Sequence, residues 1–277
     1  MERHHPIVNF IYFIFVIGFT MVIMHPVCLV ISFAAALLYV VHLFGWKQAW
    51  KGLLAMTGIM LLTAIINPAF NHQGMTVLTY LPSGNILTLE SILYGIAAAF
   101  MLGATVMWFR CVSEILTSDK IVYLFGKTFP VFGLLLSMIL GFVPKIQRKF
   151  SEIQQCRGKR GIENLSILIT WTLEDAVDTA DSMKSRGYGM EGRTTFTTYR
   201  FTKRDGIRCV YLLLSGIYIL IGMISGKFVW YYYPQIGGSG VEIYPVSIYI
   251  VYLLVCIFPL WEDYMEERKW NKLQSGI

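Results

Sequence analysis

Apolar residues occur in long runs separated by short polar stretches, which is not the amphipathic pattern of a water-soluble domain. Six runs approach the roughly 17–25 apolar residues that a helix needs to cross a bilayer. They lie near Ile7–Met24, Val27–Phe44, Gly52–Ile66, Leu89–Val112, Ile207–Gly226 and Tyr244–Trp261. We therefore expect an all-α integral membrane protein with about six transmembrane helices and a cytoplasmic or interfacial helical module.

Composition supports this class. Hydrophobic residues make up 56% of the 277 positions and charged residues only 14%, whereas soluble domains carry about 25% charge. The five cysteines are scattered without CxxC spacing, so neither a disulfide framework nor a zinc site is expected. The five histidines form no metal-binding pattern, and we expect no metal, no cofactor and no catalytic residue.

The distribution of basic residues predicts the orientation in the membrane. Segments 1–6, 45–51, 110–128, 145–208 and 262–277 together hold 22 of the 23 Lys and Arg. Because cytoplasmic loops of membrane proteins are rich in Lys and Arg, we place these segments, and both termini, in the cytoplasm. The basic excess of 145–208 fits anionic membrane lipid or a protein partner better than nucleic acid.

The apolar stretch Phe129–Val143 lies between two basic segments and has a proline at each end. A crossing would export one of those basic segments, so we expect an interfacial or partly inserted helix that lies along the cytoplasmic leaflet or dips into it. The chain then divides into transmembrane helices over 1–112, interfacial and cytoplasmic helices over 113–206, and further transmembrane helices with a tail over 207–277.

Two short cytoplasmic segments resemble each other. Glu152–Gly158 and Asp181–Gly187 each have an acid five positions before an Arg, and a Gly directly after it. The two arginines are 29 residues apart. An Arg followed by Gly is a common helix ending, but the repeat indicates two matched helix ends at which a partner docks.

The residues around each arginine predict two helices. Pro144 should open the first, from Lys145 to about Arg157, and the second should run from about Asn164 to Arg186, with Gly158, Gly161 and Gly187 as stops. One side of the second helix carries polar residues that could pair with a partner's cations: Asp175, Asp178 and Ser182.

Two apparent nucleotide motifs fail. Gly126-Lys-Thr128 lacks the glycine that a phosphate-binding loop needs five positions earlier, where Ile121 stands. The Gly187–Gly192 match to GxGxxG follows a helix rather than a strand. A membrane chain with a docking module and no nucleotide site fits a subunit that transmits the work of a separate ATPase. An integral membrane enzyme with a dispersed site and a standalone permease remain as alternatives.

The chain resembles the transmembrane coupling (T) component of energy-coupling-factor (ECF) transporters, which import vitamins and metal ions. The likeness is carried by Phe142-Val-Pro144, Gln155-Cys-Arg157-Gly158 and Ala180-Asp-Ser-Met-Lys-Ser-Arg186-Gly187-Tyr188. It extends to the outer segments Asn67–Leu78 and Tyr80–Asn85.

The resemblance implies a non-catalytic subunit in a prokaryotic cell membrane, with two cytosolic ABC-type ATPases and a small substrate-binding membrane subunit as partners. By position, the ATPase-docking triplets become Cys156-Arg157-Gly158 and Ser185-Arg186-Gly187, with Cys156 and Ser185 where the family often has Ala. The stretch 129–143 would touch the substrate-binding subunit, through Phe129, Leu136 and Phe142.

Overall fold

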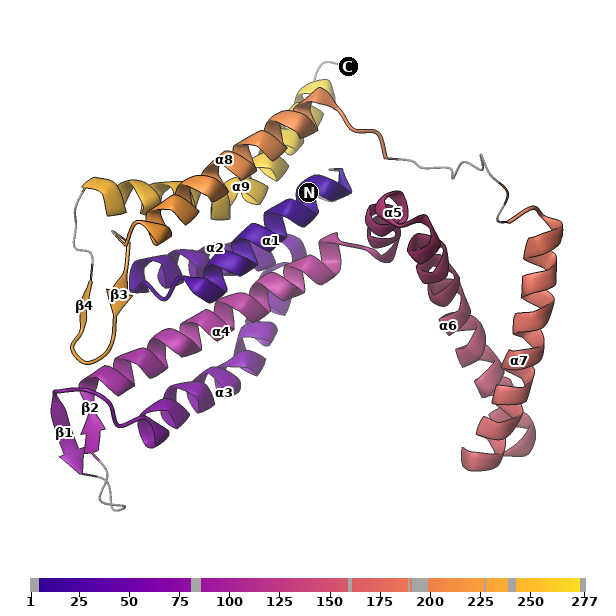
Figure 1. Ribbon diagram of the computed structural model, residues 1–277, viewed down its shortest axis with the longest axis horizontal. Coiled ribbons are helices and arrows are strands. Elements are labelled where there is room, and N and C mark those ends of the chain that lie inside the picture. The colour runs from indigo at the N-terminus through magenta and orange to yellow at the C-terminus, as the bar shows by residue number, and fades with distance from the viewer. Residues whose placement is uncertain are drawn as a thin grey trace. The chain divides into compact units, whose positions relative to one another are not determined.

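The computed structural model describes residues 5–80, 86–158, 161–188, 190, 199–226, 228–238 and 243–274. Nine helices and two short hairpins make up this part of the chain (Figure 1). The helices are α1 (Pro6–Val22), α2 (Pro26–Phe44), α3 (Trp46–Phe70), α4 (Leu89–Ile115), α5 (Ser118–Thr128), α6 (Pro130–Arg157), α7 (Gly161–Ser185), α8 (Lys203–Ile224) and α9 (Ile243–Gln274).

The chain forms two compact units. Met1–Leu116 and Phe201–Ile277 form a helical bundle that contains α1 to α4, α8 and α9. Thr117–Arg200 forms the second unit, with α5, α6 and α7, which we call the hairpin module. Antiparallel strand pairs follow α3 and α8: β1 (Val77–Tyr80) with β2 (Ile86–Thr88), and β3 (Trp230–Tyr231) with β4 (Gly237–Gly238).

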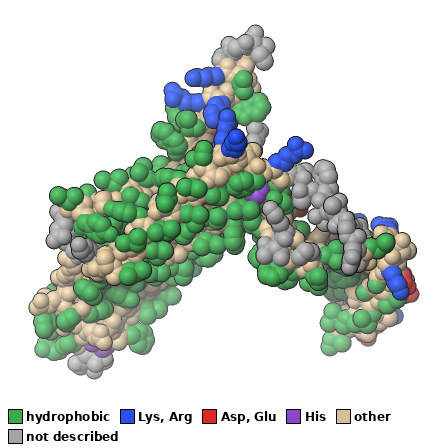
Figure 2. Space-filling view, turned by 45° about the horizontal axis from the view of Figure 1, so that its top comes forward, with side chains coloured by type: hydrophobic (Ala, Val, Ile, Leu, Met, Phe, Trp, Pro, Cys, Tyr) green, Lys and Arg blue, Asp and Glu red, His purple; other side chains and the backbone are tan. Residues whose placement is uncertain are grey.

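Among the described residues, six helices are long and apolar enough to cross a membrane: α2, α3, α4, α6, α8 and α9. On the face drawn in Figure 2, hydrophobic side chains cover most of the length of the bundle helices. The chain is therefore an all-α integral membrane protein, as the sequence predicts. The predicted run Ile7–Met24 corresponds to α1, which has 17 residues and is not one of these six helices. In its place the six include α6, which was not among the predicted runs.

The expectation that Pro144 begins a new helix is wrong. A single helix, α6, runs for 28 residues from Pro130 to Arg157, with Pro144 inside it. Pro68 and Pro259 likewise lie inside α3 and α9, and both helices are longer than the predicted spans Gly52–Ile66 and Tyr244–Trp261. Proline removes one backbone hydrogen bond, but its fixed φ is compatible with a helix, and the remaining turns hold the helix together.

The core of the bundle surrounds α1. Val8, Tyr12 and Val16 are fully buried at successive turns of this helix. Close packing of α3 against α4 depends on glycine: a Cβ on Gly95 would lie 2.7 Å from the carbonyl oxygen of Ala64. Small residues at helix contacts are typical of membrane bundles, because attraction between helices in lipid requires close contact.

A buried hydrogen-bond network joins four helices. Thr20 of α1 donates to the Val16 carbonyl (2.7 Å), so its oxygen accepts from Ser32 of α2 (2.7 Å) and from Tyr252 of α9 (3.1 Å). Ser32 in turn accepts from the indole nitrogen of Trp108 on α4 (3.0 Å). Each of these buried polar groups thus has a hydrogen-bond partner. The hydrogen bonds also link the helices in a way that apolar contacts alone do not.

At the opposite end from the N-terminus, His25 caps α2. Its Nδ1 accepts from the Val27 amide (3.3 Å), so the proton lies on Nε2, which is 2.8 Å from the Tyr249 hydroxyl. In the loop after α8, Tyr232 donates to the Met24 carbonyl (3.0 Å). Burial raises the pKa of Tyr232 to about 12, which favours the protonated hydroxyl that donates this bond.

The network predicts the effect of removing its central hydroxyl. Ser32→Ala leaves the Trp108 indole and the Thr20 oxygen each without one partner, and should lower the free energy of unfolding by about 1–2 kcal/mol. Thermal unfolding in detergent measures the change. Ser113→Ala is the control, because the Ser113 hydroxyl is exposed and bonds only to its own helix at Phe109 (3.0 Å). Equal midpoints for the two variants would contradict the prediction.

Candidate functional site

The helices α6 and α7 form an antiparallel hairpin (Figure 1). Lys145 of α6 contacts both carboxylate oxygens of Asp175 of α7, at 2.6 and 2.7 Å. The amines of Lys145 and Lys149 lie 5.5 and 5.3 Å from the centre of the Trp171 ring. An ion pair and two cation–π contacts therefore hold the midsections of the two helices together.

The apex of the hairpin is closed around Gly158. This residue has φ 75°, and its amide donates to the Gln154 carbonyl (2.9 Å), which ends α6 directly after Arg157. The fully buried Asn164, in the first turn of α7, donates to the Gly158 carbonyl (2.8 Å). Ile153 of α6 and Leu168 of α7 are also buried. The backbone on either side of Arg157 is thus fixed, while its side chain is exposed.

The far end of α7 has a Schellman ending. The Gly187 amide donates to the Lys184 carbonyl and the Tyr188 amide to the Met183 carbonyl, each at 3.0 Å. Gly187 has φ 72°, which favours glycine, and a Cβ there would lie 2.9 Å from the Met190 sulfur. Arg186 is the capping residue, and its side chain is exposed.

The two predicted triplets lie at opposite ends of α7. This helix has 25 residues, which at 1.5 Å per residue separates its ends by about 37 Å. Five of the six triplet residues are exposed and Gly187 is partly buried. The predicted stops at Gly158 and Gly187 are found, whereas Gly161 begins α7. The arrangement places two exposed arginines at two separate ends of the module.

On the polar side of α7, one residue contacts α6 and the others face solvent. Asp175 pairs with Lys145 inside the module, whereas Asp178 and Ser182 are exposed. The Ser182 carbonyl accepts from the Ser185 hydroxyl (2.8 Å) and the Arg186 amide (3.2 Å). Ser182 therefore also helps to form the helix end that carries Arg186.

An apolar stripe runs along another side of α7. Its members recur every three or four residues and are each at least half exposed: Ile162, Leu165, Ile169, Leu173 and Val177. Within the described residues these side chains form an unpartnered helix face, which is the kind of surface that inserts into an apolar groove or a lipid surface.

The helix α5, which sequence analysis treated as part of a cytoplasmic segment, crosses α6. Gly126 and Gly133 meet there so closely that a Cβ on Gly133 would lie 2.2 Å from the Gly126 Cα atom. Gly126 of the apparent phosphate-binding motif is thus a packing residue in a helix. Two glycines seven positions apart, with Pro130 between them, are the signal that could have predicted this crossing.

Beside the crossing lies an open apolar hollow of about 510 Å³, lined by Phe125, Phe129, Val131, Phe132 and Leu135. Of the three residues predicted to touch a substrate-binding subunit, Phe129 is exposed and lines this hollow, while Leu136 and Phe142 are partly buried.

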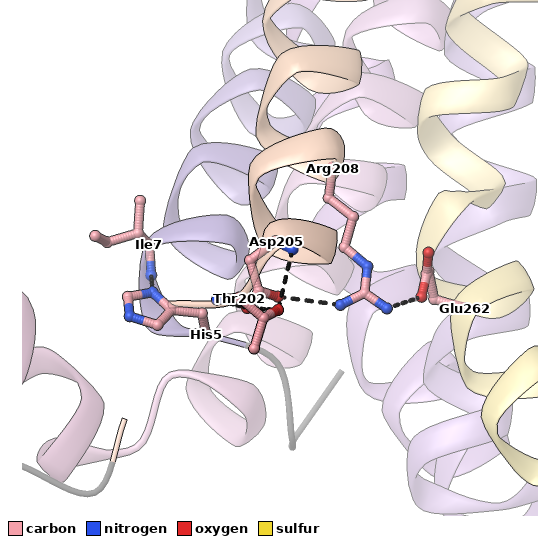
Figure 3. Close-up of polar contacts among 6 residues, drawn as sticks. All are labelled: His5, Ile7, Thr202, Asp205, Arg208 and Glu262. Carbon is pink, nitrogen blue, oxygen red and sulfur yellow. Dashed lines mark hydrogen bonds and ion pairs between the residues drawn. The ribbon is translucent and has the colours of Figure 1, made fainter. Parts of the chain in front are cut away.

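A polar cluster in the bundle fixes the start of α8 (Figure 3). Thr202 and Asp205 form a capping box, in which the Asp205 carboxylate accepts from the Thr202 amide (3.0 Å) and hydroxyl (2.6 Å). Arg208 binds Asp205 (3.1 Å) and also Glu262 of α9. Sequence analysis missed this cluster, although the spacing Thr202-x-x-Asp205 before an apolar run is its signature.

No protein-family model and no curated protein matches the sequence of this chain. Among the described residues, no three His, Cys, Asp or Glu side chains are grouped so that they could hold a metal ion. The Gly187–Gly192 match to GxGxxG lies partly outside the described residues.

The Schellman ending predicts a local effect of one substitution. Gly187→Ala forces a β-carbon into a left-handed backbone conformation and against Met190, and should destabilise the last turn of α7 by about 1 kcal/mol. Hydrogen exchange of the amides of residues 186–188 should then become about fivefold faster. Gly141→Ala is the control, because a Cβ there meets no atom within 4 Å. Unchanged exchange in Gly187→Ala would show that glycine is not required.

Proposed function

We propose that this chain is the transmembrane coupling subunit of an ECF-type ABC importer. The observation that carries the proposal is the pair of exposed arginines, Arg157 and Arg186, each at a closed helix end of one hairpin. An arginine at such an end has a fixed backbone and an exposed side chain. Its guanidinium can therefore bind carboxylates or backbone carbonyls of a partner at low entropic cost.

The distance between the two arginines favours two like partners. Ends about 37 Å apart cannot enter one pocket, but two matching triplets suit the two equivalent grooves of an ATPase dimer. Each cytosolic ABC-type ATPase subunit would take one triplet. Asp178 and Ser182, which are exposed near the second triplet, would supplement this contact.

The apolar stripe on α7 supports the same reading of the hairpin. A helix that exposes Leu173 and Val177 along one face and is capped by Arg186 at its end suits the helix-in-groove mode of recognition. The apolar hollow at Phe129 would contact the small substrate-binding membrane subunit, together with Leu136 and Phe142. Closure of the ATPase dimer would then move α7 and α6, and through them the substrate-binding subunit.

In this proposal the chain is not an enzyme and binds neither ATP nor the solute, which other subunits hold. It spans a prokaryotic cytoplasmic membrane with both termini inside, in agreement with its distribution of Lys and Arg. Membrane lipid is its remaining partner, and nucleic acid has no part in the function.

Charge reversal at the two arginines tests the docking role. Arg157→Glu or Arg186→Glu should weaken association with the ATPases by about 2 kcal/mol or more, because each leaves an unpaired charge at the contact. The measurement is co-purification from cells that co-express the neighbouring genes, followed by an ATPase assay.

Arg148→Glu is the matched control, since Arg148 is also an exposed arginine on α6 but not at a helix end. Recovery of the full complex with both Arg157→Glu and Arg186→Glu present would overturn the proposal. Loss in the Arg148→Glu control as well would indicate a general effect of charge on the module.

A charge exchange separates the two possible roles of Asp175. Asp175→Lys should weaken docking by disturbing the hairpin, and the exchange Lys145→Asp with Asp175→Lys should restore it, because the ion pair is rebuilt within the module. The pair is partly exposed, so its contribution to stability is about 0.2–1 kcal/mol. The same co-purification measures both variants. Docking that stays lost in the exchanged variant would instead assign Asp175 to the partner contact.

A further inference from the structure

Exposed aromatic residues mark the end of the bundle at which α2 finishes and α3 begins. Trp46 and Trp50 lie one turn apart on α3 and are 64% and 46% exposed, with their rings edge to face at 5.8 Å. Tryptophan at the end of a membrane helix is typical of the headgroup level, where the apolar ring and the polar N–H group are both accommodated.

Three cations from two helices gather at the same place. Lys47 and Lys51 are exposed and one turn apart on α3. Arg110 reaches across from α4: its guanidinium lies 4.5 Å from the centre of the Phe44 ring and fills the space that a side chain on Gly52 would need. Gly52 follows Lys51 directly, so the guanidinium is held beside the lysine-bearing turn.

These cations have no acidic partner in the described part of the chain. Lys47, Lys51 and Arg110 make no ion pair there, and Glu114, one turn beyond Arg110 on α4, makes none with it either. Segment 45–52 contains no Asp or Glu. By contrast, Arg208 in the same bundle binds two carboxylates. The patch therefore carries uncompensated positive charge and fits an anion.

The surface next to the patch identifies the kind of anion. From Lys51 towards its C-terminal end, α3 exposes apolar side chains, and the exposed fractions are 65% for Leu54, 63% for Leu61 and 65% for Ile65. A free phosphate would use only the cations. A phospholipid would use both surfaces, with its phosphate at the cations and its acyl chains along α3.

We propose that Lys47, Lys51 and Arg110, framed by Trp46 and Trp50, bind the headgroup of an anionic phospholipid. The site fixes α3 and α4 at the depth of the lipid phosphates. It lies in the bundle and uses no residue of the hairpin module, so it is independent of the proposed coupling function.

Lipid titration of the purified full-length chain, followed by native mass spectrometry, tests the site. Phosphatidylglycerol should bind and phosphatidylcholine should not. The triple variant Lys47→Gln, Lys51→Gln and Arg110→Gln should lose phosphatidylglycerol affinity by about fivefold per cation. The double variant without Arg110→Gln alters only exposed side chains and should fold normally, so a loss there cannot come from unfolding. Unchanged affinity in both variants would overturn the site.

Two controls separate a built site from general attraction. Arg268→Gln, Lys269→Gln and Lys272→Gln remove three exposed cations from α9, as many cations as the triple variant removes, and should leave the affinity unchanged. An equal loss in this control would overturn the site in favour of net charge. Inorganic phosphate should not displace the lipid, and displacement at equal concentrations would overturn the lipid assignment in favour of a simple anion site.

Discussion

Every helix in a lipid environment must satisfy its own backbone hydrogen bonds, and only its ends are left with unpaired groups. This constraint shapes the whole chain. His25 closes the start of α2, and the Thr202–Asp205 capping box closes the start of α8. Gly158 and Gly187 close the ends of α6 and α7. The side chains at such ends sit on a fixed backbone, which is what a docking residue requires.

Between the ends, the bundle needs something other than hydrophobicity to choose one packing. Lipid tails are as apolar as leucine, so apolar side chains alone do not select their neighbours. The Thr20–Ser32–Trp108–Tyr252 network does so by direction, because a hydrogen bond forms only when its donor and acceptor face each other. The close contact at Gly95 adds a steric constraint, because only a residue without a side chain fits there. The network selects the helices that meet α1, and the glycine contact sets how closely α3 approaches α4.

The hairpin module depends less on a buried core than the bundle does. Its buried residues are few, and its two long helices are joined by the Lys145–Asp175 pair, the Trp171 contacts and the apex at Asn164. Most of its apolar side chains remain exposed. A module with firm helix ends and a thinly covered face is suited to moving as a unit against partners, which accords with the coupling role proposed for it.

The sequence by itself determined the helical class, the paired arginine ends and the stops at Gly158 and Gly187, because these follow from local hydropathy and from the conformational freedom of glycine. It failed at Pro144, where local propensity opposes a helix that the surrounding turns maintain, and at Gly161, which begins α7 instead of ending α6. Only the tertiary structure decided that Asp175 faces Lys145, that Gly126 meets Gly133, and that Arg110 lies beside Gly52. These contacts join residues far apart in the chain, and helix packing, which no single segment encodes, brings them together.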